Sequence, residues 1–252
     1  MWDREIDVVV IGYGGAGSAA AITAHDAGAE VLILEKNANG GGNTRISGGS
    51  IRTYADHAKA VEYTHALCEG ATDLETIRAF VEESAGNADW ISGLGGKIVP
   101  SPAALIQGFP RMAPGAAFPH VVGADGIGPR LRVTGTTNFF GLELWKFLAG
   151  NVEKRKIPVL YSTPAQRLIR EQSGEIGGVI ATRASTAVRI RARRGVVLAS
   201  GGFEYSKSLQ LDYLGQEYCA LGDPGCTGDG VRMAVDVGAD LWHMSGVAPC
   251  FG

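Results

Sequence analysis

The sequence lacks several features that would place it in a protein class at once. No apolar run approaches the roughly 20 residues of a membrane-spanning helix, so we expect no membrane span. There is no basic cluster and the formal net charge is −3, so no nucleic-acid partner is expected. The polar N-terminus MWDREID is unlike a signal peptide.

Cysteine is also scarce. The four cysteines, at positions 68, 219, 226 and 250, contain no CxxC pair and no other metal-type spacing, so we expect no metal site. They are typical of reduced thiols in a cytoplasmic protein. A disulfide between Cys219 and Cys226 is the alternative.

Glycine, in contrast, is abundant, with 37 residues that fall in clusters. Two of these clusters follow apolar runs of strand length, IDVVVI at residues 6–11 and AEVLILEK at residues 29–36. Continuous apolar runs are typical of parallel strands that are covered on both faces. The alanine-rich residues 18–28 between them have helical spacing. These patterns predict a βαβ unit at the N-terminus.

The rest of the chain predicts a mostly parallel α/β sheet with an inserted β-meander, which is a Rossmann-like fold. Residues 101–137 are rich in glycine and proline and are expected to form a long functional or mobile loop. The other expected elements are helices at 73–94 and 139–156, a strand at 157–161, three short β runs between 164 and 192, a buried strand at 194–203, and a helix with a short following strand at 228–241.

The first glycine cluster is a GxGxxG motif formed by Gly12, Gly14 and Gly17. It follows a strand, opens a helix, and is followed by the acidic Glu35 at the end of the second strand, which is the context that a dinucleotide-binding motif requires. Gly12 permits the tight turn, Gly14 lets a pyrophosphate touch the backbone, and Gly17 lets the helix pack on the strand. Glu35 would bind a ribose diol, whereas the alternative is a tight turn with an exposed Glu35.

The second cluster, GGGNTRISGG at residues 40–49, offers further backbone amides with polar side chains between them. A nicotinamide site rarely needs such a loop here, whereas a larger cofactor lying along both loops does; the alternative is a flexible linker. Residues 198–202 (LASGG) end another buried strand at the usual ligand edge of a sheet, unless they are only a tight strand exit. Thr227 is expected to cap the helix that begins at Gly228.

Four segments stand in one order and span nearly the whole chain: DVVVIGYGGAGSAAAITAHDAGAEVLILEK, GGNTRISGG, RGVVLASGGFEYS and TGDGVRMAVDVGA. Together they resemble the FAD-binding part of the fumarate reductase/succinate dehydrogenase flavoprotein family. Within it, the soluble branch with 3-ketosteroid dehydrogenases and fumarate- or urocanate-reductase-like enzymes is most similar. The resemblance implies an FAD-dependent oxidoreductase that transfers hydride between flavin N5 and a CH–CH or C=C substrate, either an unsaturated acid or a ketosteroid-like molecule.

The resemblance also implies a set of FAD contacts. Asn43 stands about where succinate dehydrogenases carry a histidine joined to the flavin, so noncovalent FAD is expected. The pyrophosphate contacts would be Gly12, Gly14, Gly15, Ala16 and Gly17, and the adenosine ribose would contact Glu35 with Lys36 beside it. The remaining contacts would be Gly42, Asn43, Thr44, Ser47, Gly48, Gly49, Ser50, Ala165, Ala199, Ser200, Gly201, Thr227, Gly228 and Asp229.

The catalytic residues are not assigned by the resemblance. Family members continue with a capping domain and a second FAD-contacting segment, so residues 1–252 are expected to be the N-terminal FAD-binding portion of a longer or split enzyme. The substrate histidine of fumarate reductases falls at Cys250, and residues 101–137 lack the tyrosine that ketosteroid dehydrogenases use. The local candidates for contact with a small-molecule substrate are Arg111, His120 and His243.

Several readings of the same residues therefore stay open. The chain could belong to an NAD(P)-binding Rossmann enzyme or to an amine-oxidase-like flavoprotein, because both use the GxGxxG fingerprint. It could also be an FAD-binding fragment, or a subunit of a split flavoprotein, with no activity alone. In that case a capping domain or a second subunit would be its partner.

Overall fold

The structure of the chain is a computed structural model that describes residues 1–101, 115–136, 140–242 and 244. The chain divides into two compact units: the first comprises Met1–Ile46 and Trp145–Gly252, and the second comprises Ser47–Leu144. The predicted FAD-binding domain spans both units. Within the described ranges, no helix has both the length and the apolar character that a membrane crossing requires.

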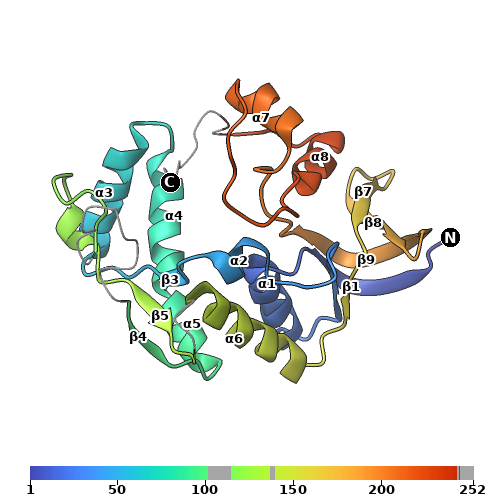
Figure 1. The fold of residues 1–252 in the computed structure, drawn as a ribbon, viewed down its shortest axis with the longest axis horizontal. Coiled ribbons are helices and arrows are strands. Elements are labelled where there is room, and N and C mark those ends of the chain that lie inside the picture. Colours follow the sequence, from blue (N-terminus) through green and yellow to red (C-terminus); the bar gives the residue numbers. More distant parts are fainter. Residues whose placement is uncertain (102–114, 137–139, 243, 245–252) are drawn as a thin grey trace. The chain divides into compact units, whose positions relative to one another are not determined.

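The first unit is built on a six-stranded sheet with the strand order β6-β2-β1-β9-β8-β7. The pairs β6–β2, β2–β1 and β1–β9 are parallel, whereas β9–β8 and β8–β7 are antiparallel. A mostly parallel sheet with a meander is thus confirmed (Figure 1). The strands are β1 (Arg4–Ile11), β2 (Val31–Leu34), β6 (Val159–Leu160), β7 (Ala165–Arg170), β8 (Ile176–Arg183) and β9 (Thr186–Leu198).

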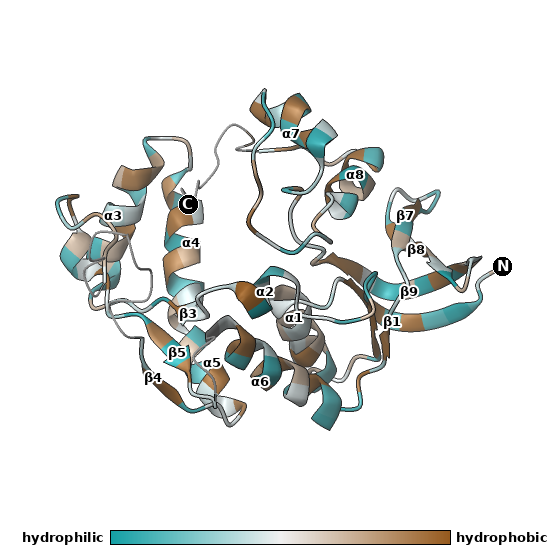
Figure 2. Cartoon of the chain, in the orientation of Figure 1, coloured by the Kyte–Doolittle hydropathy of each residue, from teal (hydrophilic) through white to brown (hydrophobic). Residues whose placement is uncertain are grey.

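The predicted βαβ unit consists of β1, the helix α1 (Gly15–Asp26) and β2. Val9 and Val10 on β1 are fully buried, as are Leu32 and Ile33 on β2, because neighbouring elements cover both faces of these central strands. The ribbon of β1 changes from hydrophilic residues at its start to hydrophobic ones toward its end (Figure 2). Because its last residues are hydrophobic, the carboxyl end of the strand is buried in the core, next to the first glycine turn.

The strand β9 differs from the prediction, which had two separate strands over its length. It is one continuous strand of 13 residues that pairs with β8 on one side and with β1 on the other. Its side chains alternate, so Ile190 and Ala192 are buried while Arg191 and Arg193 are exposed. Arg191 and Arg193 form ion pairs with the acidic residues of β1, including Arg193 Nε to Asp7 Oδ1 at 2.9 Å. Pairing with β1 therefore keeps the strand extended where a turn was expected.

The second unit contains a small antiparallel sheet with the order β3-β5-β4, which the sequence did not predict. The expected helix at 73–94 is divided at Gly86 into two helices, and Asp73 caps the first of them by accepting a hydrogen bond from Thr76 N at 2.8 Å. The elements are β3 (Ser50–Ile51), α3 (His57–Cys68), α4 (Leu74–Ala85), α5 (Asn87–Gly93), β4 (Ile98–Pro100), η1 (Ala124–Gly126) and β5 (Leu131–Val133).

Both α3 and α4 contribute to the core of this second unit. Tyr63 on α3 and Val81 on α4 are buried in one cluster with Ile127, and the Tyr63 hydroxyl accepts a hydrogen bond from Phe118 N at 3.0 Å. Phe80 on α4 lies outside this core and is 52% exposed. The ribbon of α4 carries hydrophobic and hydrophilic residues side by side (Figure 2).

The remaining helices are α2 (Gly42–Ile46), α6 (Phe140–Lys154), α7 (Lys207–Leu214) and α8 (Asp229–Asp236). The helix α6 confirms the prediction for residues 139–156, and α8 confirms the helix near the C-terminus. Among the described residues 237–242 no strand follows α8, which differs from the prediction. Neither α7 nor the short α2 was predicted.

We expect Gly178→Ala to destabilise the protein because of the close pairing of β8 and β9. A Cβ atom on Gly178 would lie 2.2 Å from the Ile190 carbonyl oxygen, whereas a Cβ atom on Gly195, in the same sheet, would meet nothing within 4 Å. The free energy of unfolding, measured by urea denaturation, should fall by about 1–3 kcal/mol for Gly178→Ala. The control Gly195→Ala should change it by less than about 0.5 kcal/mol. Equal effects of the two variants would contradict the observed pairing.

Candidate cofactor-binding site

A cavity of about 550 Å³ lies in the first unit. Ile11, Leu34 and Leu198, which are the last residues of β1, β2 and β9, line it together with the loops that follow these strands. The three strands are parallel neighbours, so their carboxyl ends meet at one edge of the sheet. This edge is where open α/β sheets bind their ligands.

The turn after β1 depends on close backbone approaches. Gly12 has φ +103°, and a Cβ atom there would lie 2.3 Å from the Ala199 carbonyl oxygen. A Cβ atom on Gly17 would lie 2.0 Å from the Gly12 carbonyl oxygen. Protein packing alone therefore requires glycine at both positions, as the sequence predicted for the turn and for the contact between helix and strand.

Gly14 differs from these two glycines. A Cβ atom on Gly14 would meet its nearest neighbours, the Gly41 carbonyl oxygen and Thr44 Oγ1, at 3.6 Å, which is an ordinary contact distance. Gly14 also lines the cavity. The protein itself leaves room for a side chain here, so a bare backbone at this position suits a ligand that lies against it.

The N-terminus of α1 faces the same cavity with backbone amides. Ser18 N donates to the Gly14 carbonyl at 2.9 Å, so the amides of Gly15, Ala16 and Gly17 precede the first intrahelical bond. The Gly15 amide donates to Thr44 Oγ1 at 2.8 Å. The amides of Ala16 and Gly17 have no hydrogen-bond acceptor within the helix, because no helical turn precedes them. The helix dipole adds positive potential at the same place. This arrangement fits a diphosphate.

Glu35 is held in place at the end of β2. The residue is only 7% exposed, which contradicts the alternative of an exposed terminal Glu35. Its Oε2 accepts a hydrogen bond from Tyr13 N at 2.9 Å, and its Oε1 accepts one from Asn37 N at 2.8 Å. A carboxylate has about four acceptor positions, so each oxygen keeps a lone pair for a ribose hydroxyl. The geometry fits the predicted role in binding a ribose.

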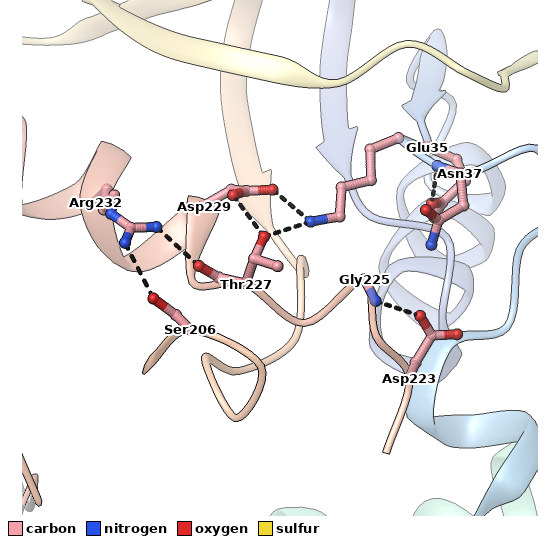
Figure 3. A network of polar contacts seen from close by, with 9 residues as sticks. Glu35, Asn37, Ser206, Asp223, Gly225, Thr227, Asp229 and Arg232 are labelled. Atoms are coloured by element: carbon pink, nitrogen blue, oxygen red, sulfur yellow. Dashed lines mark hydrogen bonds and ion pairs between the residues drawn. The ribbon is translucent and has the colours of Figure 1, made fainter. Parts of the chain in front are cut away.

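The residues at the start of α8 form a polar network with Lys36. Thr227 and Asp229 of this network are labelled in Figure 3. Lys36 Nζ donates to Thr227 Oγ1 and to Asp229 Oδ2, both at 2.7 Å, and the Thr227 hydroxyl donates to Asp229 Oδ1 at 2.9 Å. The N-cap of α8 is Gly228, and it has no side-chain capping bond. The prediction that Thr227 caps this helix is therefore wrong, because its hydroxyl is used by Lys36 and Asp229 instead.

A second group of polar contacts joins α2 to residues on either side of α7. Asn43 donates through Nδ2 to Glu204 Oε1, and its Oδ1 accepts a hydrogen bond from Asp223 N at 2.6 Å. Arg45 Nη2 lies 3.3 Å from Asp223 Oδ2. The glycine-rich stretch that could have been a flexible linker is thus a short helix with long-range partners.

The structure brings most of the predicted contacts together around the cavity. Gly17, Thr227 and Gly228 belong to the same unit but do not line it. Ser47, Gly48, Gly49 and Ser50 belong to the second unit, so their part in cofactor binding stays a prediction. The lining residues that were predicted are Gly12, Gly14, Gly15, Ala16, Glu35, Lys36, Gly42, Asn43, Thr44, Ala165, Ala199, Ser200, Gly201 and Asp229.

The candidates for substrate contact gain no support from the geometry. His120 lies exposed in the second unit. Arg111, His243 and Cys250 lie outside the described residues. The catalytic assignment therefore stays a prediction.

Sequence reasoning missed several lining residues, including Tyr13, Asn37, Asp223 and Cys226. Tyr13 occupies a variable position of the GxGxxG motif, and its buried ring packs against Trp145 with a centroid distance of 4.7 Å. Asp223 and Cys226 precede the TGDG segment that was quoted, so extending that segment upstream would have found them.

Cys226 has an unreactive environment. Burial, reinforced by the nearby Glu204 carboxylate, raises the pKa of its thiol to about 11. Cys219 is exposed, and both cysteines are free thiols in the structure, which contradicts the alternative of a disulfide between them. The expectation of reduced thiols is confirmed for Cys68, Cys219 and Cys226.

The site therefore defines a dinucleotide-binding protein, and comparison with known proteins narrows the class. Residues 7–249 match the family described as "FAD binding domain". The chain therefore belongs to this family, and FAD is its cofactor.

Individual relatives agree with this assignment. The chain is 25% identical over 252 residues to the fumarate reductase (cytochrome) of Shewanella frigidimarina, covering 95% of this chain and 41% of that protein. It is 27% identical over 262 residues to the urocanate reductase of Eggerthella lenta, covering 95% of this chain and 39% of that protein. The chain thus spans well under half the length of these curated relatives.

A solved structure is similar over nearly the whole chain. The 3-ketosteroid-delta4-(5alpha)-dehydrogenase from Rhodococcus jostii RHA1 superposes with a TM-score of 0.84 at 29% identity, covering 97% of this chain and 56% of that chain. These similarities confirm the resemblance to the soluble branch of the flavoprotein family.

We predict that Gly14→Val abolishes FAD retention, because the valine side chain would occupy the place where the diphosphate meets the backbone. Stability should change little, since a Cβ atom at Gly14 meets protein atoms only at 3.6 Å. FAD content is measured by absorbance after gel filtration. Gly150→Ala serves as the control, because a Cβ atom there meets nothing within 4 Å. Unchanged FAD content in Gly14→Val would refute the assignment.

We also predict that Cys226 reacts slowly with alkylating reagents in the folded protein. With a pKa of about 11 its thiol stays protonated at pH 8, and only the thiolate reacts. Iodoacetamide should label the exposed Cys219 at least about tenfold faster than Cys226, as measured by mass spectrometry of the two peptides. In urea the two rates should become similar. Comparable rates in the native protein would contradict the described burial.

Proposed function

We propose that this chain is the FAD-binding part of an oxidoreductase that acts on CH–CH or C=C groups of a small molecule. The observation that carries the proposal is the convergence of the α1 N-terminus, the bare backbone of Gly14 and the fixed carboxylate of Glu35 on one cavity. FAD, when bound there, supplies hydride transfer at its N5 position. The named relatives, which include reductases and a dehydrogenase, support this reaction class.

The residues of this chain bind and orient the cofactor in this proposal. The Ala16 amide at the start of α1 holds the diphosphate, because it lines the cavity and lacks an acceptor within the helix. The Glu35 carboxylate, fixed by two backbone amides, accepts hydrogen bonds from the ribose hydroxyls. Leu34 and Met233 exclude water from the cavity wall.

The FAD is held without a covalent bond in this proposal. Asn43 stands about where the succinate dehydrogenases carry the histidine that is joined to the flavin, and an amide side chain is not a nucleophile that could form such a bond. Its amide is instead engaged with Glu204 and with the backbone of Asp223. Release of FAD by denaturation is therefore expected.

The substrate and its proton donor belong to parts of the protein beyond this cavity in our proposal. Each carboxylate, amine and thiol group among the described lining residues is already engaged within the protein, so we assign none of them as the proton donor. Glu35, Lys36 and Asp229 are hydrogen-bonded, and Cys226 is buried and protonated. A capping domain or a second subunit would then supply the proton donor for an unsaturated acid or a ketosteroid-like substrate. The longer relatives support this division.

The test is a titration of the purified chain with FAD, followed by single-turnover experiments. We expect one FAD per chain, recognised by flavin absorption bands and released on denaturation. The bound FAD is then reduced with dithionite and mixed anaerobically with fumarate, urocanate or 4-androstene-3,17-dione. Re-oxidation of the flavin by the chain alone should be slow.

Two outcomes would contradict this proposal. A protein that stays colourless in excess FAD but binds NADH would favour an NAD(P) enzyme. Rapid re-oxidation by any of the three substrates would show that the chain needs no capping domain. An FAD-binding chain that supports turnover only when a second subunit is added would agree with the split form of the enzyme.

A further inference from the structure

The cavity wall carries an unusual charge balance for a site that receives a diphosphate. The charged side chains among its described lining residues are three carboxylates, Glu35, Asp223 and Asp229, and one ammonium group, Lys36. A diphosphate is itself negative. Its binding therefore requires that each of these carboxylates be compensated locally.

Two of the three carboxylates are compensated without Lys36. Glu35 accepts hydrogen bonds from two backbone amides, those of Tyr13 and Asn37. Asp223 accepts a hydrogen bond from Gly225 N at 2.8 Å and forms its ion pair with Arg45. Neither carboxylate therefore needs the ammonium group of Lys36.

Asp229 is compensated differently. Its partners are Lys36 Nζ at 2.7 Å and the Thr227 hydroxyl at 2.9 Å (Figure 3). Of these two, only Lys36 carries a positive charge. Asp229 is the first residue of α8, where the helix dipole favours a negative side chain but supplies only a partial charge.

Lys36 also connects distant parts of the chain. It follows β2, and its two partners stand 191 and 193 residues later in the sequence, at the start of α8. The side chains of Lys36 and Asp229 are 27% and 34% exposed, so solvent screens the pair only in part. Charge-assisted hydrogen bonds of this length hold the first turn of α8 against the end of β2.

Arg232 provides a comparison within the same network. It holds the Thr227 carbonyl with Nη1 at 2.8 Å and Ser206 Oγ with Nη2 at 3.1 Å (Figure 3). Arg232 thus fixes the same turn but does not line the cavity. Substitution of Arg232 therefore tests the structural role of the turn separately from the charge effect of Lys36.

We propose that Lys36 is a positioning residue for the cofactor that acts through Asp229. It cancels the Asp229 charge at the cavity wall and holds α8 there, and it does not itself contact the diphosphate. The inference rests on the proposed function, since the ligand is FAD. The resemblance placed Lys36 beside Glu35 at the adenosine ribose, whereas its partners in the structure are Thr227 and Asp229.

The test is a double-mutant cycle with Lys36→Met, Asp229→Asn and the double variant, each titrated with FAD by fluorescence quenching. Lys36→Met leaves Asp229 charged and uncompensated, so the Kd for FAD should rise about tenfold. In the Asp229→Asn background the same change should raise the Kd less than about twofold, because no charge is left to cancel. A penalty of equal size in both backgrounds would mean that Lys36 contacts FAD directly and would overturn the proposal.

Two further measurements distinguish a charge effect of Lys36 from a purely structural one. They are the salt dependence of the Lys36→Met penalty and the effect of Arg232→Met on the Kd for FAD. The penalty of Lys36→Met should shrink as salt is raised from 0.05 to 0.5 M (roughly a threefold shorter screening length), because salt screens repulsion between Asp229 and the diphosphate. Arg232→Met should lower the thermal stability of the apo-protein but leave the Kd for FAD within about twofold.

An Arg232→Met penalty on FAD binding as large as that of Lys36→Met, unaffected by salt, would overturn the proposal. Failure of the proposed function is recognised separately, because the unsubstituted chain would then bind no FAD at all. The cycle is interpreted only from the differences among variants of a chain that binds FAD, so the two failures cannot be confused.

Discussion

The site depends on one steric constraint, the approach of bare backbone to backbone where β1 ends. Cβ atoms on Gly12 and Gly17 would lie 2.3 and 2.0 Å from carbonyl oxygens, so any side chain would push the strand, the helix and the neighbouring loop apart. Because both positions are glycine, α1 starts directly above the strand ends and its amides reach the cavity. The packing of the turn and the binding of an anion are thus two consequences of one local geometry.

That geometry places negative ligand charge in a wall that is itself rich in carboxylates. Glu35 is compensated by backbone amides, Asp223 by an amide and Arg45, and Asp229 by Lys36 and Thr227. The two cations, Lys36 and Arg45, come from the stretch after β2, and their acidic partners are Asp229, the first residue of α8, and Asp223, just before it. For Asp223 and Asp229, the compensation of charge and the association of these two parts of the chain are therefore achieved by the same contacts.

The parts of the fold that local sequence determines could be predicted. The apolar runs in β1 and β2, the GxGxxG turn and Glu35 follow from short-range patterns, and the structure places all of them as expected. The continuity of β9 could not be predicted, because it depends on pairing with β1, more than half the chain away. The role of Thr227 was misassigned for the same reason, since local pattern favours a cap while Lys36 is distant in sequence.

The chain order also explains why the site is assembled from two distant segments. The second unit, Ser47–Leu144, is inserted between α2 and the return of the chain to the sheet at β6. On that return, Thr163 N donates to the Glu35 carbonyl at 2.9 Å and Glu35 N donates to the Leu160 carbonyl at 2.9 Å. Lengthening an insertion adds little closure entropy. The dinucleotide site can therefore stay constant while the inserted unit varies, which suits a fold whose members act on different substrates.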